Sequence, residues 1–244
     1  MSQKELNSPN RFSLPNSYRD KRIVVRLNNV GKRYNRDWIF RHCNYSFTSG
    51  VSYAITGANG SGKSTLLQVI AGAILHNEGT VDYFEDAESP IADKKTASAN
   101  IHHPASGIQT YRYLSIAAPY LDLVEEMTAK ETIEFHARFK SMIPGFSFAD
   151  ILQTVGLENA TDKQLRYFSS GMKQRLKLAL AFFSNTPVLL LDEPTTNLDA
   201  DGVALYHQLF SNYTKDKLVI ISSTVKQEYE FCEEVIEISK FKST

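Results

Sequence analysis

A nine-residue segment rich in glycine carries the side chains best suited to bind a chain of phosphates. Residues 57–65 read Gly-Ala-Asn-Gly-Ser-Gly-Lys-Ser-Thr and fit the phosphate-binding loop pattern. Glycines let a backbone wrap closely around phosphate oxygens, and the N–H groups that begin the following helix favour an anion. Lys63 would bridge the β- and γ-phosphates, and the Ser64 hydroxyl would complete a Mg²⁺ shell. The segment therefore predicts that the chain binds a nucleoside triphosphate with magnesium.

Two acidic residues that follow an apolar run could complete a metal and hydrolysis site. The run Val188 to Leu191 is typical of a buried strand, and Asp192 and Glu193 come directly after it. Magnesium prefers oxygen ligands, so we predict that Asp192 binds it together with Ser64. A carboxylate beside the γ-phosphate can orient or deprotonate the attacking water, and we assign this role to Glu193. An apolar strand that ends in Asp-Glu is common, so the interpretation depends on its pairing with the glycine-rich segment.

The pattern of apolar residues predicts the elements that must hold these side chains. Alternating or β-branched runs predict strands at residues 23–30, 51–55, 79–84, 188–191 and 218–221. Helical spacing predicts helices at residues 66–70, over most of 121–165 with a break at 144–145, and at 172–183. Residues 85–110 are polar and are interpreted as a long surface loop. Strands that alternate with helices favour an α/β fold.

Composition excludes several classes of protein. The 244 residues are 42% hydrophobic, and 27 basic side chains balance 27 acidic ones, which gives no overall field that points to nucleic acid. No apolar run approaches the ~20 residues of a spanning helix, and no N-terminal stretch resembles a signal peptide. Cys43 and Cys232 are far apart, so neither a disulfide framework nor a cysteine metal cluster is expected. We therefore expect a cytosolic, core-forming protein without a direct membrane span.

The basic residues are concentrated at the N-terminus. Residues 1–41 contain ten Lys/Arg against three acidic residues, a local net charge of +7. We interpret residues 1–20 as a flexible tail, since they are rich in Ser, Asn and Pro without an apolar period. The excess charge fits a solvated tail and strand face, and contact with an acidic partner or a lipid surface stays open.

Three further motifs resemble those of ABC-type ATPases. Residues 168–175, Phe-Ser-Ser-Gly-Met-Lys-Gln-Arg, resemble the family's signature motif, and residues 192–199, Asp-Glu-Pro-Thr-Thr-Asn-Leu-Asp, resemble its linked Walker B and D-loop. Tyr34 resembles the aromatic residue that stacks on adenine. The motifs come in the family's order and the resemblance covers roughly residues 22–240. The chain is thereby identified as a member of the ABC nucleotide-binding domains.

This resemblance implies a fold, two ligands and a dimer. Residues 21–244 would form a P-loop NTPase core sheet with a small antiparallel β layer and a helical subdomain inserted at about residues 119–168. ATP and Mg²⁺ would bind between two domains that close head to tail, either a homodimer or a paired ABC ATPase. Ser169 and Gly171 would face the partner's γ-phosphate, and Asp199 would communicate across the dimer. Within one chain the remaining nucleotide contacts would come from Tyr34, Gly57, Asn59, Gly60, Ser61, Gly62, Lys63, Ser64 and Thr65.

The chain departs from the family pattern at three places. Ser170 and Met172 replace the usual Gly and Gln of the signature. The Q-loop glutamine is missing, since its expected position falls near Pro119, and the position of the switch histidine falls at Ser223. Those two side chains help to hold water and γ-phosphate in line in the family. Because Glu193 is intact, we expect a Mg²⁺-dependent ATPase with slow but genuine turnover.

The resemblance favours one function over others. We expect an ATP-hydrolysing subunit that powers a membrane transporter through a separate integral membrane permease, peripheral on the cytoplasmic face of the cell membrane. The alternative is a non-transport soluble ABC ATPase, an assembly factor or a slow ATP-dependent switch. The cargo and its direction are not readable, because the permease chooses the cargo.

Some charged residues invite a functional interpretation that the sequence does not support strongly. The acidic stretch Asp122 to Glu126 follows the Q-loop position, where the family docks its membrane partner, and it also fits an exposed helix start. His102 and His103 have no third ligand at metal spacing. His136 is interpreted as a helix-surface residue, and the cations from Lys173 to Lys177 as the solvated face of a helix.

Overall fold

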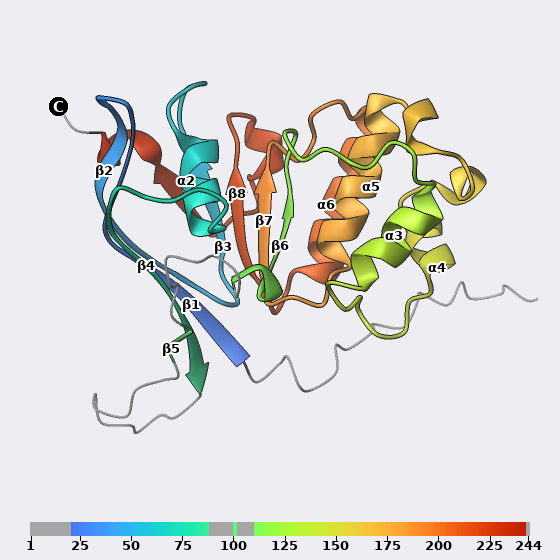
Figure 1. The fold of residues 1–244 in the computed structure, drawn as a ribbon, viewed down its shortest axis with the longest axis horizontal. Helices are drawn as coiled ribbons and strands as arrows, with labels where there is room; N and C mark the ends of the chain where they lie inside the picture. The colour runs from blue at the N-terminus through green and yellow to red at the C-terminus, as the bar shows by residue number, and fades with distance from the viewer. Residues whose placement is uncertain (1–20, 88–99, 102–109, 243–244) are drawn as a thin grey trace, which may run out of the picture.

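The strands form two sheets, seen in a computed structural model that describes residues 21–87, 100–101 and 110–242 (Figure 1). Within these residues a parallel sheet has the order β6 (Leu114–Ala117), β7 (Val188–Asp192), β8 (Leu218–Ser222), β3 (Ser52–Thr56) and β9 (Glu234–Glu237). An antiparallel sheet has the order β2 (Asp37–Thr48), β1 (Lys21–Tyr34), β4 (Glu78–Ala87) and β5 (Asn100–Ile101). The expected α/β architecture with a small antiparallel layer is confirmed.

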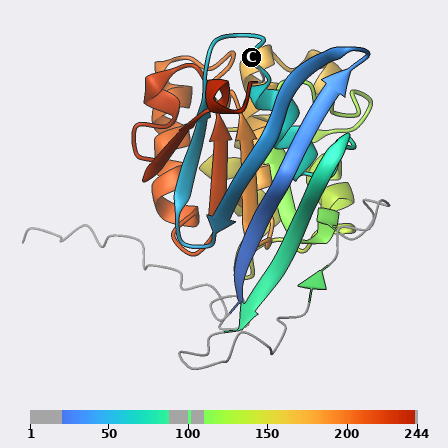
Figure 2. The same ribbon diagram turned by 90° about the vertical axis from the view of Figure 1, so that its left-hand side faces the viewer.

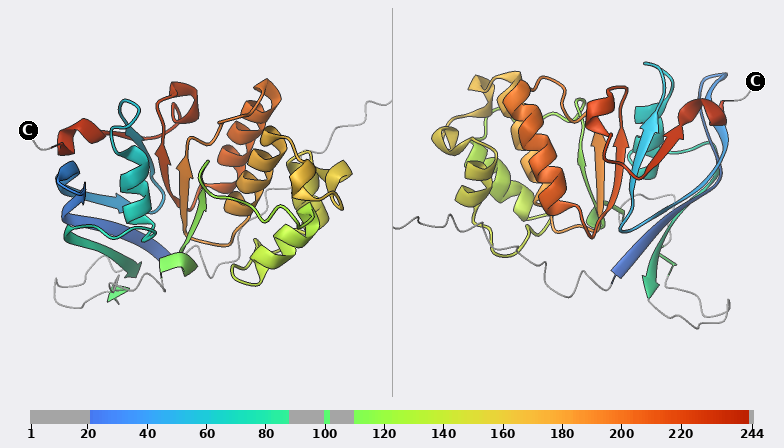
Figure 3. Two further views of the ribbon diagram at one scale, coloured as in Figure 1. Left: turned by 45° about the horizontal axis from the view of Figure 1, so that its top comes forward. Right: turned by 180° about the vertical axis from the view of Figure 1, so that it is seen from behind.

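The central strands of the parallel sheet are buried on both faces, because their apolar residues alternate between two cores. Leu190 and Ile220 pack toward the antiparallel sheet and α2 (Lys63–Ile70). Leu191 and Ile221 pack toward α5 (Ser170–Phe182) and α6 (Ala200–Tyr213). Unbroken aliphatic runs are therefore required in β7 and β8. Figures 1 and 3 show the resulting succession of antiparallel sheet, α2, parallel sheet and the helices beyond it.

The antiparallel sheet supports the helix that follows the glycine-rich segment. Figure 2 shows this sheet facing the viewer, with the parallel sheet behind it. Ile23, Val25 and Leu27 of β1 are fully buried on its inner face. From β4, the Tyr83 hydroxyl donates a hydrogen bond of 2.6 Å to the Ile70 carbonyl at the end of α2. The sheet thus holds α2 by apolar packing and by satisfying a terminal carbonyl.

The helical part lies between β6 and β7 in sequence and contains α3 (Ala129–Ala137), α4 (Phe148–Thr154) and α5. Thr128 and Ser147 cap α3 and α4, each in a capping box with the acidic residue three positions later. The predicted break at residues 144–145 falls between α3 and α4. Short 3₁₀ segments complete the described chain: η1 (Thr110–Arg112), η2 (Glu158–Ala160), η3 (Leu165–Tyr167), η4 (Lys226–Glu228) and η5 (Ile238–Phe241). The subdomain limits of about 119–168 stay a prediction.

Three sequence interpretations fall wholly or partly outside the described residues. The tail over 1–20, His102 and His103, and most of the expected loop at 85–110 lie outside the described residues. Residues 85–87 and 100–101 were expected in that loop, but they belong to β4 and β5, which pair with each other. The reason is that β1 begins at Lys21 and supplies pairing partners as far as Ala87.

His136 is not the helix-surface residue that the sequence predicted. Its Nε2 lies 2.8 Å from the Ser184 hydroxyl, and the ring is half-buried. Burial, with a smaller effect from Lys140, lowers the pKa of His136 to about 4. His136 is therefore a packed neutral residue that links α3 to the segment directly after α5.

The acidic and basic runs next to the helical part pair with each other. Glu125 lies 2.5 Å from Lys173, and Glu126 lies 3.6 Å from Arg166. Lys177 donates to the carbonyls of residues 118 and 119, at 3.3 and 3.1 Å. Lys173 and Lys177 of α5 thus anchor the preceding loop and are not simply part of a solvated face. The acidic stretch at 122–126 is no helix start either, because α3 begins at Ala129.

Candidate nucleotide-binding site

The glycine-rich segment joins the carboxyl end of β3 to α2, as the sequence predicted. Gly57, Gly60 and Gly62 have φ angles of 144°, 73° and 105°, a region that side chains other than glycine rarely adopt. A Cβ at Gly62 would lie 2.4 Å from Cγ2 of Ile39, and one at Gly57 would lie 2.7 Å from Cγ2 of Ile238. Glycine is therefore required at 57 and 62 both by the turn and by the close contact with β2 and η5.

Lys63 is buried inside the loop. Its Nζ donates hydrogen bonds of 2.9 and 3.1 Å to the carbonyls of Gly57 and Ala58, and the residue is 5% exposed. A buried ammonium needs such partners or an anion. The Lys63 ammonium thus lies inside the curved backbone of the loop, and this arrangement suits the loop to bind a phosphate.

A hollow of about 220 Å³ brings the predicted site residues together. The loop and the start of α2 form one side of it, Ile39 of β2 forms another, and Glu193, directly after β7, closes it. Seven of the predicted residues line it: Asn59, Gly60, Gly62, Lys63, Ser64, Thr65 and Glu193. The two halves of the site, 128 positions apart from Thr65 to Glu193, therefore meet as expected from the shared edge of a parallel sheet.

Asp192 has the surroundings of a metal ligand. It is 2% exposed, and its Oδ1 has no hydrogen-bond partner among the described residues. Burial raises the pKa of Asp192, and the neighbouring hydroxyls of Ser222 and Ser64 partly offset this effect. An unpaired buried carboxylate oxygen beside a serine hydroxyl is a donor set that suits Mg²⁺, which takes oxygen ligands and keeps several waters. The residues present therefore fit the ion that the sequence predicted.

Glu193 is held in an unusual backbone conformation at the edge of the hollow. Its φ is +41°, and its N–H donates to the Ser222 carbonyl at 2.9 Å while its own carbonyl accepts from Thr196 at 3.1 Å. Asp192 and Ser222 are paired in register between β7 and β8. Such conformations persist only where the surroundings enforce them, and they concentrate at functional sites. The turn therefore directs Glu193, which follows the predicted metal ligand Asp192, into the hollow.

The signature-like segment begins α5. The exposed Ser169 caps the helix by accepting a hydrogen bond from the Met172 N–H at 3.2 Å. A Cβ at Gly171 would lie 3.0 Å from the Asn197 carbonyl, so this segment packs closely on the D-loop. Asp199 caps α6 through the Gly202 N–H at 2.8 Å. These three residues have local structural roles here, and contact with a partner's nucleotide stays a prediction.

Tyr34 ends β1 at the hairpin that leads into β2. It is 48% exposed, and the Lys32 ammonium lies 4.7 Å from the centre of its ring. Tyr34 does not line the hollow, although Ile39 from the same hairpin does. Its stacking on adenine therefore remains a prediction, compatible with an exposed ring on an adjacent strand.

Comparison with known proteins decides the family. The family model described as ABC transporter matches residues 40–196, which is more than half of the chain. The chain belongs to the ABC transporter family. Its fold, a parallel sheet with helices and a small antiparallel sheet, is the one that the resemblance implied.

Curated relatives of this ABC chain carry related names. It is 28% identical to the uncharacterized ABC transporter ATP-binding protein YybJ of Bacillus subtilis, over 88% of this chain and 93% of that protein. It is 27% identical to the lantibiotic transport ATP-binding protein SrtF of Streptococcus pyogenes, over 85% and 82%. It is also 27% identical to the putative hemin import ATP-binding protein HrtA of Staphylococcus aureus, over 91% and 99%.

Solved structures share the fold of the ABC chain. A dimeric post-hydrolysis ATP-binding cassette bound to ADP and Pi matches with a TM-score of 0.71 and 24% identity, over 88% of this chain and 94% of that one. A putative ABC transporter ATP-binding protein from Pyrococcus furiosus matches with a TM-score of 0.69 and 16% identity, over 90% and 100%. At these identities the likeness concerns the fold alone.

At two of the predicted departures from the family pattern, Pro119 and Ser223, the structure has polar groups at the position or next to it. Next to Pro119, the Tyr120 hydroxyl lies by Gln68 of α2 and by Asp192, and burial together with Asp192 raises the pKa of Tyr120. Ser223 is fully buried and donates to a carboxylate oxygen of Glu228. Sequence reasoning missed Tyr120 and Glu228, because no motif spacing distinguishes a tyrosine in a loop or a glutamate in a short helix.

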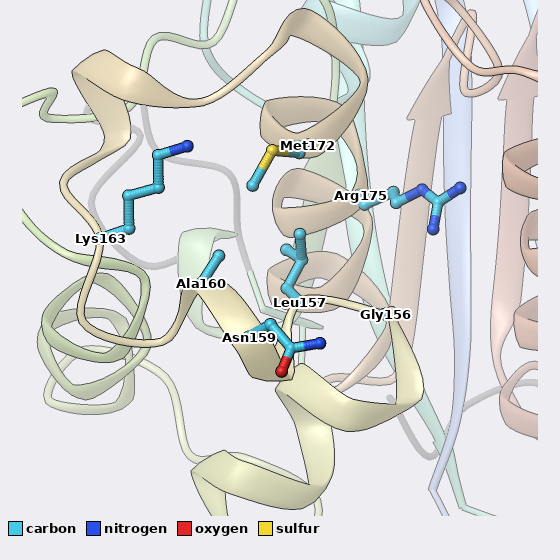
Figure 4. Close-up of a pocket in the computed structure, with 7 residues that line it drawn as sticks. All are labelled: Gly156, Leu157, Asn159, Ala160, Lys163, Met172 and Arg175. Carbon is cyan, nitrogen blue, oxygen red and sulfur yellow. The ribbon is translucent and has the colours of Figure 1, made fainter.

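A second hollow, of about 300 Å³, lies in the helical part of the ABC chain. Figure 4 shows its lining: Gly156, Leu157, Asn159, Ala160, Lys163, Met172 and Arg175. None of the predicted nucleotide-binding residues lines it. Arg175 extends to the side opposite Lys163 and pairs with Asp199 at 3.2 Å. The larger hollow is therefore separate from the phosphate loop.

Proposed function

We propose that this chain hydrolyses ATP with Mg²⁺ and thereby powers a membrane transporter through a separate permease. The observation that carries the proposal is the meeting of Lys63, Ser64 and Glu193 in one hollow, with the unpaired oxygen of Asp192 beside Ser64. Phosphoryl transfer to water requires groups that bind the phosphates, ligands for the metal ion and a carboxylate base, and these residues supply all three.

Each side chain has a distinct task in this mechanism. Lys63 leaves its two backbone carbonyls and pairs with the β- and γ-phosphates, whose oxygens the loop N–H groups also bind. Ser64 and Asp192 would hold Mg²⁺, which neutralises charge on those oxygens when it is bound. Glu193 accepts a hydrogen bond, and then the proton, from the water that attacks the γ-phosphate. The φ of +41° at Glu193 sets the direction in which its side chain leaves the backbone.

A second chain would complete the site. Ser169 is exposed at the N-terminus of α5, so the free N–H groups and the positive end of the helix dipole are open to an anion from outside this chain. A homodimer or a paired ABC ATPase, arranged head to tail, would place a γ-phosphate there. The dimeric form of the related cassette supports this arrangement.

A permease would supply the membrane-spanning part. Among the described residues, no helix has both the length and the apolar character needed to cross a bilayer. The names of relatives refer to lantibiotic transport and hemin import, each for an ATP-binding protein. On this basis we place the chain at the cytoplasmic face of the cell membrane, attached to an integral membrane partner.

A slow ATP-dependent switch without transport is the second candidate, favoured by Ser223 and Pro119 at the switch and Q-loop positions. To separate the two, tagged Glu193→Gln protein is purified with ATP from detergent-solubilised native cells, and its partners are identified by mass. A stoichiometric multi-spanning membrane protein supports transport. Soluble partners only, or a bare homodimer, would contradict the permease and favour the switch.

A further inference from the structure

Glu228 is a buried carboxylate that the nucleotide-binding motifs leave unexplained. It is 2% exposed at the end of η4. One carboxylate oxygen accepts hydrogen bonds from the Thr195 N–H at 2.8 Å and from the Thr195 hydroxyl at 2.5 Å. The other oxygen accepts a hydrogen bond from the Ser223 hydroxyl. Burying a carboxylate is costly unless donors compensate it, and these three donors do so.

The backbone of Glu228 is fixed as well. Its carbonyl accepts a hydrogen bond of 2.7 Å from the buried Tyr206 hydroxyl of α6. The neighbouring Gln227 carbonyl lies 2.9 Å from Nε2 of His207, also on α6. Because its own backbone is anchored to α6, Glu228 has a fixed position. Its carboxylate therefore sets the positions of Thr195 and Ser223.

Both partners of Glu228 adjoin the strained turn at Glu193. Thr195 comes two residues after Glu193, and Ser223 follows the serine whose carbonyl accepts the Glu193 N–H at 2.9 Å. On its other side the turn is held by the buried Gln174 of α5, whose amide donates to the Pro194 carbonyl at 2.8 Å. The contacts form a closed path from Glu193 through Ser222, Ser223, Glu228 and Thr195 back to Glu193.

We propose that Glu228 is a positioning residue for ATP hydrolysis, which fixes the turn at Glu193 to the segment that carries Ser223. The inference rests on the proposed function, since it concerns the orientation of the proposed base. Its role is geometric: Glu228 touches neither the phosphate loop nor the hollow in the described residues. At Ser223, the position of the missing switch histidine, the chain has a rigid link to Thr195 instead of a group directed at the nucleotide.

The test compares two substitutions that differ in geometry. Glu228→Gln keeps a carbonyl for Thr195 and offers its amide to the Ser223 oxygen, so kcat is expected to stay within about threefold of the unsubstituted chain. Glu228→Ala removes both links, and kcat is expected to fall roughly tenfold to a hundredfold, the usual scale for a misplaced catalytic group. MgATP affinity, measured by fluorescence of Trp38, is expected to change less than twofold in both.

A second variant guards against a folding defect in Glu228→Ala. Thr195→Val replaces the hydroxyl by a methyl group and keeps the N–H, so kcat is expected to fall severalfold. The double variant Glu228→Ala/Thr195→Val is expected to be no slower than Glu228→Ala alone. Glu230→Gln, exposed two residues along the chain, is the matched control and is expected to behave as the unsubstituted chain. Amide exchange of peptide 193–199 should accelerate in Glu228→Ala only.

The outcomes separate this inference from the proposed function. Unchanged kcat in Glu228→Ala, equal losses in Glu228→Gln and Glu228→Ala, or a parallel loss of MgATP affinity would each overturn the positioning role. Absence of turnover in the unsubstituted chain would overturn the proposed hydrolysis and the kinetic role with it. In that case accelerated exchange over 193–199 in Glu228→Ala would still show that Glu228 holds the turn.

Discussion

Replacement of Gly62 by alanine tests the packing that shapes the phosphate loop. The residue has a φ of +105°, and the new Cβ would lie 2.4 Å from Cγ2 of Ile39. The left-handed conformation costs an L-residue about 1–2 kcal/mol, and overpacking costs about 1–3 kcal/mol more. We therefore expect Gly62→Ala to lower the free energy of unfolding by about 2–5 kcal/mol, a large part of a total of about 5–15 kcal/mol.

Gly60→Ala is the matched control, because Gly60 has a φ of +73° and no atom within 4 Å of its would-be Cβ. It carries only the conformational cost, about 1–2 kcal/mol. Ile39→Ala removes the clashing methyl, so Ile39→Ala/Gly62→Ala should be less destabilised than the sum of its single variants by about 1–3 kcal/mol. Urea unfolding of the four variants measures this. Equal effects of Gly60→Ala and Gly62→Ala, with additivity in the double variant, would refute the reasoning.

Three further predictions follow from buried or capping groups. Lys63→Ala should abolish MgATP binding, measured by Trp38 fluorescence, since no other cation of the predicted motifs is placed to replace it; retained binding would contradict the site. Burial lowers the pKa of Lys217 to about 7, so the unfolded chain binds more protons above that pH and stability should rise with pH, by roughly 2 kcal/mol between about pH 7 and 9. Lys217→Met should lose this slope in urea unfolding, and an unchanged slope would count against Lys217. Ser169→Ala removes the cap of α5 and should lower stability by about 1 kcal/mol, with Ser170→Ala, also exposed, as the neutral comparison; equal effects of the two would argue against the cap.

The sequence predicted the phosphate loop and the α/β architecture because both depend on local patterns. Positive φ angles demand glycine at Gly57 and Gly62, and burial on both faces demands continuous aliphatic runs in β7 and β8. Such requirements are visible as residue types at neighbouring positions of the sequence. The meeting of Glu193 with the loop was also predictable, because carboxyl ends of parallel strands share an edge.

The surroundings of Glu193 could not be predicted in the same way. Gln174 and Glu228 lie 19 positions before and 35 positions after it in sequence, and each is a single polar residue without a motif. Their roles arise only when α5 and η4 pack against the turn. His136 was misassigned for a related reason. Its ring contacts Ser184, directly after α5, and the apolar pattern within residues 129–137 contains no sign of that distant partner.

ATP turnover by the Glu193→Gln variant tests the central claim most directly. The substitution keeps the shape of the side chain and removes its ability to take a proton, so the account predicts a loss of at least about a hundredfold in kcat, the scale of general-base catalysis. MgATP binding, followed by Trp38 fluorescence, should remain. Turnover equal to that of the unsubstituted chain, measured with its partner present, would contradict the assignment of Glu193 as the base.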